Sequence, residues 1–236
     1  MTDDRTVSPR RCGVVIFDFD GTVADTMPFL VDLAARLLRE RYGLSDAAAR
    51  KAYIDTTGLP FCRQIEIIFP ANPLNKATVE AFEAEKRNHL ADFRFFTEAP
   101  SVIAELRKRG IRVCLSSGNV DGIIEPVLAR RGLAVDLVMG WRPDFEKGPD
   151  HFRYAAGTLG VPLDEILFVG DSLKDGLAAR AGGVRFVARA GLVDRAELER
   201  ALPGTPVIDS LTEVLPLLGI NRTREALGPS GTPRAS

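Results

Sequence analysis

The chain has 236 residues, of which 45% are hydrophobic and 27% are charged, with a formal net charge of −1. This length suits one large domain or a core with an insertion. The near-neutral charge provides no general positive field for nucleic acid, and no apolar run approaches the roughly 18 residues of a membrane-spanning helix, so neither partner is predicted.

The first predicted element is a buried strand that ends in two carboxylates. Val14 to Phe17 are apolar, Asp18 follows, Asp20 comes two residues later, and Gly21 turns the chain. Because strand residues i and i+2 point to the same side, we expect the two aspartates to converge. Like charges in a buried place repel, which indicates a cation or a reaction there. The alternative is an acidic loop that caps the next helix.

Residues 27–97 have helical periodicity and no convincing strand. The predicted helices cover residues 28–42, from 45 or 46 to near 58, 61–69 and 76–93. The loop that follows the second of them is predicted to face the substrate, because Gly58 permits close approach and Arg63 can pair with an anionic group. In the alternative, this loop only joins two helices and Arg63 is solvated.

After residue 97, short apolar strands alternate with helices. Strands are predicted at residues 111–115, 135–139, 165–169, 184–188 and, weakly, 206–208, with helices at 101–109, 121–131, 150–159, 173–181 and 194–202. This alternation predicts an α/β fold with a doubly wound, Rossmann-like parallel sheet. The helical block then leaves the carboxyl edge of the sheet, where ligands bind in such folds, and can act as a lid.

We therefore predict an α/β core of residues 12–25 and 98–218 and an inserted helical cap of residues 26–97. Residues 1–11, which lack the apolar centre of a signal peptide, and residues 221–236 are predicted to be flexible tails. The three cysteines have no metal-site spacing, so we expect no disulfide framework and a cytoplasmic protein. We expect Cys114 to be a small core residue.

Polar residues follow four of the predicted strands: Asp18 with Asp20, the run Ser116-Ser117-Gly118-Asn119, the loop that leads to Lys147, and Asp171 with Asp175. These four strand ends can meet in one crevice of a doubly wound sheet. Carboxylate oxygens without Cys or His pairs favour a hard cation, above all Mg²⁺. A divalent cation, an ammonium and a hydroxyl together suit a phosphate dianion.

These residues resemble the four motifs of the haloacid dehalogenase-like hydrolases in order and spacing: Asp18-Phe-Asp20-Gly21-Thr22, Ser116, Lys147 and Gly170-Asp171-Ser172-Leu-Lys-Asp175. The resemblance covers about residues 12–210. It is closest to the phosphatase branch with a small helical cap after the first motif, which includes phosphoglycolate phosphatases and β-phosphoglucomutases. In one respect the chain departs from many of these phosphatases, because Gly148 separates Lys147 from the following proline. Lys174 is therefore the alternative to Lys147.

The resemblance implies a role for each motif residue. Asp18 would attack phosphorus and form an aspartyl-phosphate, and Asp20 would protonate the leaving alkoxide and then deprotonate water. Lys147 would let the anionic nucleophile approach an anionic phosphate. Mg²⁺ would be held by Asp18, the backbone carbonyl of Asp20 and Asp171, and Asp175 would support the metal waters or orient Lys147. The phosphoryl oxygens would be held by Ser116, Ser117, Gly118 and Asn119.

The predicted function is a Mg²⁺-dependent phosphatase that hydrolyses a small phosphorylated metabolite through an aspartyl-phosphate. Two alternatives stay open: a phosphomutase of the β-phosphoglucomutase type, which would share every core residue, and a non-catalytic phosphate-binding regulatory protein. Asp20 argues against a dehalogenase, since the resembling dehalogenases have an aromatic residue there. His89 and His151 are predicted to have surface or capping roles. The oligomeric state is left open between monomer and homodimer.

Overall fold

The computed structural model describes residues 11–89 and 92–220. A parallel sheet is built from β1 (Val14–Asp18), β2 (Arg112–Val120), β3 (Leu137–Trp141), β4 (Ile166–Gly170), β5 (Arg185–Arg189) and β6 (Val207–Ile208). These strands lie side by side in the order β3-β2-β1-β4-β5-β6. The chain runs outward from β1 to β3 and then crosses to β4, so the predicted doubly wound sheet is confirmed, with its switch point between β1 and β4.

Ten α-helices occur among the described residues. They are α1 (Met27–Tyr42), α2 (Asp46–Asp55), α3 (Phe61–Ile68), α4 (Asn75–Asn88), α5 (Ala99–Lys108), α6 (Ile124–Arg130), α7 (Pro149–Leu159), α8 (Leu173–Gly182), α9 (Arg195–Ala201) and α10 (Val214–Leu217). Local signals set several of these ends. Pro28 stands in the first turn of α1, and Gly43 ends that helix in the left-handed conformation that glycine readily adopts. Ser45 caps α2 by accepting a hydrogen bond from the Ala48 N–H.

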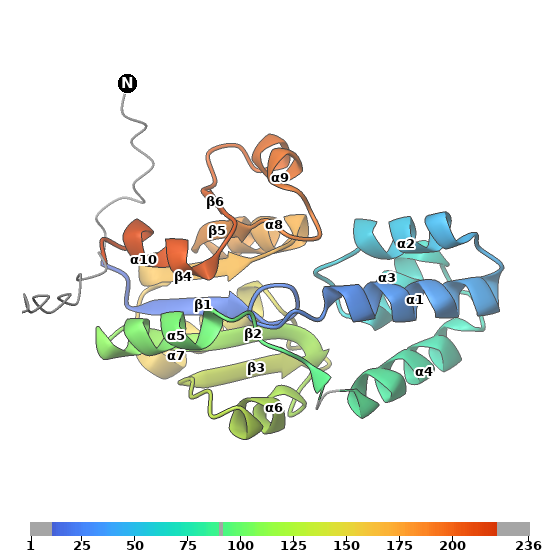
Figure 1. Cartoon of the computed structure of the whole chain (residues 1–236), viewed down its shortest axis with the longest axis horizontal. Helices are drawn as coiled ribbons and strands as arrows, with labels where there is room; N and C mark the ends of the chain where they lie inside the picture. The colour runs from blue at the N-terminus through green and yellow to red at the C-terminus, as the bar shows by residue number, and fades with distance from the viewer. Residues whose placement is uncertain (1–10, 90–91, 221–236) are drawn as a thin grey trace, which may run out of the picture.

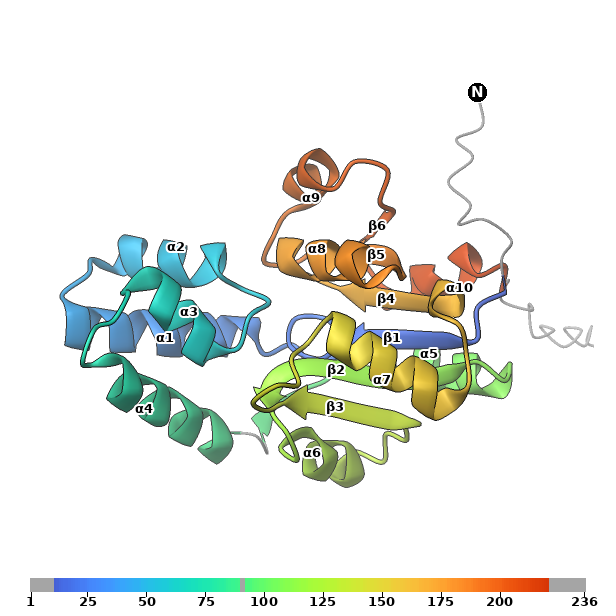
Figure 2. The same cartoon turned by 180° about the vertical axis from the view of Figure 1, so that it is seen from behind.

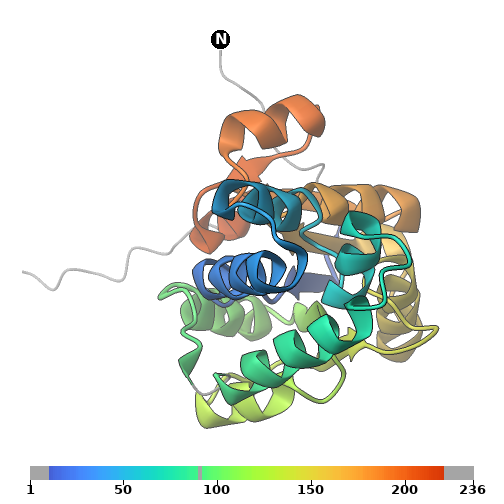
Figure 3. The ribbon, with the colours of Figure 1, turned by 90° about the vertical axis from the view of Figure 1, so that its right-hand side faces the viewer.

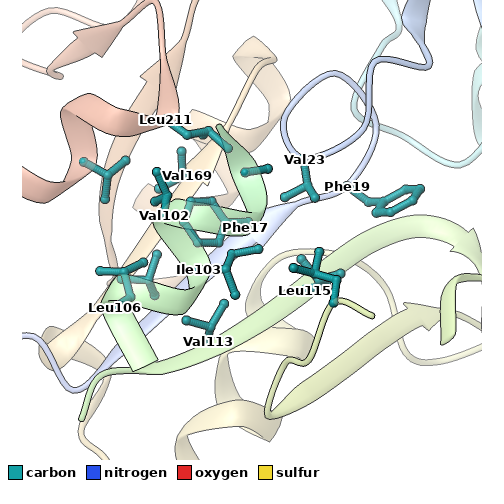
Figure 4. Packing of buried hydrophobic residues seen from close by; sticks show 14 of the residues in the cluster. Phe17, Phe19, Val23, Val102, Ile103, Leu106, Val113, Leu115, Val169 and Leu211 are labelled. Atoms are coloured by element: carbon teal, nitrogen blue, oxygen red, sulfur yellow. The ribbon is translucent and has the colours of Figure 1, made fainter. Parts of the chain in front are cut away.

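Helices cover both faces of the sheet. Helices α5, α6 and α10 pack over one face (Figure 1), in a cluster that includes Phe17 and Leu115, and Figure 4 shows the side chains of α5 beside these two residues. Helices α7 and α8 cover the other face (Figure 2), and their cluster includes Ile16 and Phe168. Neighbouring residues of β1 thus enter two different apolar clusters, and every residue of the strand is buried. This explains why its sequence is continuously apolar up to Asp18.

Helices α1 to α4 form a separate bundle with an apolar cluster of its own, in which Phe61 and Phe82 are stacked 3.9 Å apart between ring centroids. The bundle lies beyond the carboxyl ends of the strands, as Figures 1 and 3 show from two directions. We call this bundle the cap. The predicted division of the chain, in which residues 26–97 form the cap domain, stays a proposal. Among the described residues, none of the helices combines the length and apolar character needed to cross a membrane.

Two linkers connect the cap to the sheet: the first linker, residues 19–26, and the return linker, residues 92–98. They pair with each other, because the Asp25 N–H donates to the Arg94 carbonyl at 2.8 Å and the Phe96 N–H donates to the Val23 carbonyl at 3.0 Å. The cap therefore joins the core through a hydrogen-bonded pair of chain segments.

The structure corrects several predicted boundaries. Helix α4 ends at Asn88, not at residue 93; Phe93 instead packs into the cluster of the core, and Leu90 lies outside the described residues. Strand β2 continues to Val120, because pairing with β3 resumes at Trp141 after an irregularity. The run of residues 116–119 is therefore part of a strand and not a loop after one.

The end of the core differs from the prediction as well. Helix α10 and the 3-10 turn before it at Leu211–Glu213 were not predicted, since elements of three or four residues are too short to show a period. Ser210 and Glu213 form a capping box there, which is the local signal for such a start. Cys114 is fully buried, as predicted. Apart from Arg11, the predicted tails at residues 1–11 and 221–236 lie outside the described residues.

Candidate active site

The carboxyl ends of β1 and β4 bring three aspartates together at the switch point of the sheet. Asp18 is the last residue of β1, Asp171 directly follows β4, and Asp175 lies in the first turn of α8. All three are buried, and one carboxylate oxygen of each lies within 4.8 Å of the others. Asp175 is held in place by the capping box of α8, in which its carboxylate accepts hydrogen bonds from the backbone N–H and the hydroxyl of Ser172.

Lys147, from the loop between β3 and α7, reaches into this cluster. Its ammonium lies 2.7 Å from Asp18 Oδ1 and 2.6 Å from Asp175 Oδ1, and its side chain is only 6% exposed. Burial alone would lower the pKa of Lys147, but the charges of Asp175 and Asp18 outweigh burial and raise it above the ordinary value. Lys147 is therefore a permanently charged partner of both acids. The alternative cation, Lys174, instead lies on α8 beside Gly58 of the cap.

The cluster contains more negative charge than Lys147 balances. Burial raises the pKa of Asp18 well above its ordinary value, and Asp175 and Asp171 add to the rise that Lys147 opposes. Burial and Asp175 raise the pKa of Asp171 to about 7. Asp171 Oδ2 is also buried and has no hydrogen-bond partner among the described residues. Crowded, partly unpartnered carboxylate oxygens fit a hard divalent cation, which this triad could hold.

The turn after β1 depends on its glycine. Gly21 has a φ of +76°, and a Cβ added there would lie 2.0 Å from Asp171 Oδ2. The Gly21 backbone therefore packs directly against the Asp171 carboxylate, which no other residue type would permit without a shift. This close approach is the structural reason for a glycine immediately after Asp20.

Asp20 stands at the edge of the cluster and is more exposed than the three buried aspartates. Its two carboxylate oxygens accept different hydrogen bonds. The Thr26 hydroxyl donates to Oδ1 and the Asn119 side-chain amide donates to Oδ2, each at 2.6 Å. The first donor comes from the first linker and the second from the tip of β2, so the orientation of Asp20 is fixed by two separate segments of the chain.

The predicted phosphate-binding run divides into two parts. The Ser116 hydroxyl is fully buried and lies 2.9 Å from His151 Nδ1 on α7. The Ser117 hydroxyl accepts hydrogen bonds from the backbone N–H and the side-chain amide of Asn119. Gly118 and Asn119 line the cavity at the cluster, whereas Ser116 and Ser117 are not among its lining residues.

His151 differs from its prediction. It is completely buried, and burial lowers its pKa to about 4. Its ring also packs on Phe145, with the centroids 4.5 Å apart. The prediction of a surface or capping role is wrong because position 151 falls on the face of α7 that points at the sheet. His89 agrees with the prediction, since it is the C-cap residue of α4.

A cavity of about 50 Å³ lies between the aspartates and the cap. Asp18, Asp20 and Lys147 form its core side, and Tyr53, Gln64 and Phe82 contribute to its cap side. Residues of both the core and the cap line this cavity, so a molecule bound there would contact both.

Lys86 is the basic residue on the cap side of the cavity. Its side chain is 5% exposed, its ammonium lies 2.8 Å from Glu83 Oε2, and it stands over the Phe82 ring at 5.3 Å from the centroid. The sequence did not point to Lys86, because a lysine in a polar helix is usually exposed to solvent. The informative signal is that Phe82 and Lys86, four residues apart, share one face of α4.

Arg63, in contrast, is not among the residues that line this cavity. Its guanidinium donates to Glu146 Oε1 at 2.8 Å, and its side chain is 61% exposed. Of the predicted cap loop, Gly58 approaches the core instead: a Cβ added there would lie 2.3 Å from Ser172 Oγ. The structure thus brings Gly58 to the site and leaves Arg63 on the outer surface.

Comparisons with known proteins agree with this geometry. The sequence model of the haloacid dehalogenase-like hydrolases matches residues 15–189. A plasmid-encoded phosphoglycolate phosphatase of Cupriavidus necator is 30% identical over 222 residues, covering 88% of this chain and 93% of that protein. An N-acetylmuramic acid 6-phosphate phosphatase of Pseudomonas putida is 24% identical over 184 residues, covering 75% and 82%. A hydrolase structure from Pseudomonas syringae superimposes with a TM-score of 0.74 at 22% identity, covering 87% of this chain and 97% of that one.

Proposed function

Because the chain belongs to the haloacid dehalogenase-like hydrolases and is a phosphatase of a phosphorylated small molecule, we propose that it uses Mg²⁺ and an aspartyl-phosphate on Asp18. One observation carries this proposal. The buried Asp18 carboxylate lies at the end of β1, 2.7 Å from the Lys147 ammonium and beside Asp171 and Asp175. The cavity thus brings together a nucleophile, a fixed positive charge and a cluster of carboxylates suited to a metal ion.

Asp18 and Asp171, with the backbone carbonyl of Asp20, would hold the metal ion. Asp175 is less suited to direct binding, because Lys147 and Ser172 already occupy its two oxygens. When bound, Mg²⁺ would draw charge from the phosphoryl oxygens and offset the repulsion among the carboxylates. The unpartnered Asp171 Oδ2 supports this assignment, since buried carboxylate oxygens are ordinarily satisfied.

Asp18 attacks phosphorus with one carboxylate oxygen, and the bond from phosphorus to the alcohol oxygen breaks. A carboxylate is a weak nucleophile, so the rate depends on placement and on neutralisation of the phosphate charge. Lys147 supplies part of that neutralisation from a position fixed by Asp18 and Asp175. The proposed contacts to the phosphoryl oxygens come from Gly118 and Asn119, which line the cavity, and from Ser117 and Ser116 behind them.

Asp20 gives its proton to the leaving alkoxide and later takes a proton from the water that cleaves the aspartyl-phosphate. The hydrogen bonds from Thr26 and Asn119 hold its carboxylate at the rim of the cavity. Thr26 belongs to the linker that leads into the cap. The position of the cap therefore contributes directly to the placement of the acid–base residue.

We further propose that the substrate is a small phosphate ester that carries a second anionic group. Lys86 supports this, because its buried ammonium lies on the cap side of the cavity and has three donors, of which Glu83 does not use all. The names of the two related phosphatases support it as well, since phosphoglycolate and N-acetylmuramic acid 6-phosphate both contain a carboxylate. A carboxylate of the alcohol portion would then contact Lys86 while the phosphate lies at Asp18.

The test is phosphate release from a panel of phosphate esters with and without a second anionic group. We expect hydrolysis of 2-phosphoglycolate and related acids in the presence of Mg²⁺, with no release in EDTA and none by Asp18→Asn. Release that persists in EDTA or in Asp18→Asn would overturn the mechanism. Faster hydrolysis of esters without a second anionic group would overturn the substrate class alone. Interconversion of phosphate isomers without net release would indicate the mutase.

A further inference from the structure

Arg189, the last residue of β5, is a buried arginine outside the cluster of aspartates. The residue is 6% exposed, and its Nη1 donates to the Gly21 carbonyl at 2.8 Å. Its guanidinium carbon stands 3.6 Å from the ring centroid of Phe96, and its Nη2 lies 3.9 Å from Glu98 Oε1. A single side chain thus contacts two segments that are far apart in the sequence.

These three partners belong to the two linkers of the cap. Gly21 lies in the first linker, and Phe96 and Glu98 lie in the return linker. The linkers pair through the Phe96 N–H, which donates to the Val23 carbonyl at 3.0 Å, two residues from the carbonyl that Arg189 binds. Arg189 therefore contacts both linkers at the place where they leave the core.

A contact with the Gly21 carbonyl constrains the turn that carries Asp20. Gly21 packs against the Asp171 carboxylate so closely that a Cβ would lie 2.0 Å from Oδ2, and Asp20 is the preceding residue. The turn is further closed by the Gly21 N–H, which donates to the Ala24 carbonyl at 2.8 Å. Any movement of this turn shifts Asp20 and opens the contact with Asp171.

Packing alone does not account for an arginine here. A buried guanidinium is costly unless its donors are satisfied, and Arg189 Nε has no hydrogen-bond partner among the described residues. An apolar side chain would fill the space beneath Phe96 without that cost. What arginine adds is a planar group that donates to one linker and stacks on the other at the same time.

We propose that Arg189 is a positioning residue that clamps the Gly21 turn to the return linker. The clamp keeps Asp18 and Asp20 in place while the cap moves, so bending occurs on the cap side of it, near residues 25–27 and 92–94. This inference rests on the proposed function of the site, because the residues it positions are the proposed acid–base residue and metal ligand.

The first test is hydrogen exchange of the Mg²⁺-free protein, which does not depend on activity. Arg189→Met keeps an unbranched apolar side chain without donors, and Arg189→Lys keeps a donor and a charge. In Arg189→Met we expect the amides of Ala24, Asp25 and Phe96 to exchange at least about tenfold faster, and in Arg189→Lys to return most of the way to the wild-type rate. Exchange in α7 should not change in either variant.

Arg107 offers a control, since its Nη1 also donates to a backbone carbonyl, that of Ala134 at 3.3 Å, before the start of β3. Arg107→Met should leave linker exchange unchanged. Wild-type exchange of the linker amides in Arg189→Met would overturn the proposal. So would the same acceleration in Arg107→Met, because the effect would then be general loosening.

The second test is hydrolysis of p-nitrophenyl phosphate as a function of Mg²⁺. We expect Arg189→Met to lower kcat by about 10²-fold, the scale of a displaced reacting group, and to raise the Mg²⁺ concentration needed for half-maximal rate several-fold. KM should change little, and Arg189→Lys should recover most of kcat. Unchanged kcat and Mg²⁺ dependence in Arg189→Met would overturn the clamp. If the wild type releases no phosphate from any ester, the proposed function fails, and the exchange result still decides whether Arg189 holds the linkers.

Discussion

Lys147 and Asp18 form a buried ion pair, with 2.7 Å between Nζ and Oδ1 and neither side chain more than 6% exposed. The lysine comes from a loop 129 residues later in the chain than the aspartate. Their meeting depends on the parallel sheet, which places the end of β1 beside the loop that follows β3. The pair therefore links the stability of the fold directly to the proposed chemistry.

Lys147→Met should destabilise the Mg²⁺-free protein by about 3–5 kcal/mol, because it leaves buried carboxylates without their cation. Mg²⁺ should restore part of this loss. Urea unfolding with and without Mg²⁺ measures both effects. Asp18→Asn is the matched control: it removes one acid from the crowded cluster and leaves Lys147 paired with Asp175, so it should destabilise far less. Equal losses in the two variants would contradict this account of the charge balance.

His151→Gln should make folding stability less sensitive to acid. Burial lowers the pKa of folded His151 to about 4, below the usual value of 6.5. Between these values the unfolded chain binds the proton and the folded protein does not, so stability is complete above pH 6.5 and falls as the pH drops toward 4. From pH 7 to 5 the loss from His151 is about 2 kcal/mol.

Urea unfolding of wild type and His151→Gln at pH 7 and pH 5 measures this loss as a difference between the two proteins, in which the common carboxylate contributions cancel. Glutamine keeps a polar group opposite the Ser116 hydroxyl. An identical decrease in both proteins between pH 7 and pH 5 would show that folding does not lower the pKa of His151.

Lys86→Met should raise KM for 2-phosphoglycolate at least about tenfold, since one lost charged contact is worth about 1.5–3 kcal/mol. The KM for p-nitrophenyl phosphate, which has no second anionic group, should change little. Steady-state kinetics on both esters separate these effects. The control is Lys51→Met, which removes another cap lysine with a nearby acidic partner, Asp55, but a side chain that is 75% exposed. Equal changes for the two esters would remove Lys86 from substrate recognition.

Gly58→Ala should impair closure of the cap. The new Cβ would lie 2.3 Å from Ser172 Oγ, and the φ of +93° is unfavourable for alanine. We expect kcat/KM to fall at least about tenfold, because the cap cannot reach its place over the site. Gly43→Ala at the end of α1 is the matched control: its φ of +72° is also positive, but no neighbouring segment lies within 4 Å of its Cβ position, so activity should be preserved. Full activity of Gly58→Ala would mean that this close approach is dispensable.

The central part of the site could be predicted from the sequence, because the residues that indicate it are close together in the chain. Asp18, Asp20 and Gly21 stand together after an apolar run, and the alternation of strands and helices determines which strand ends meet. Features that depend on how helices and the cap pack against the sheet were not predictable. Whether position 151 faces the sheet depends on the rotation of α7, and whether Arg63 or Lys86 reaches the cavity depends on how the cap is seated. The contacts of Arg189 were not indicated by the sequence, because its partners are a carbonyl, a ring and a carboxylate that all lie far from it in the sequence.

The length of β2 escaped prediction for a related reason. Ser116, Ser117, Gly118 and Asn119 are typical turn residues, yet they remain in the strand because β3 offers a partner at Trp141. Tertiary pairing overrode local preference there. As a result, the tip of β2 carries Asn119 far enough to reach Asp20 at 2.6 Å.

The central claim, that Asp18 carries the phosphoryl group, is tested most directly by trapping. The enzyme is mixed with 2-phosphoglycolate and Mg²⁺, quenched in acid within its first turnover and reduced with borohydride, which converts an aspartyl-phosphate into homoserine. Peptide mass spectrometry should then find homoserine at position 18, and none when EDTA replaces Mg²⁺. Release of phosphate with an unmodified Asp18, or with homoserine at Asp20 or Asp171 instead, would contradict the mechanism.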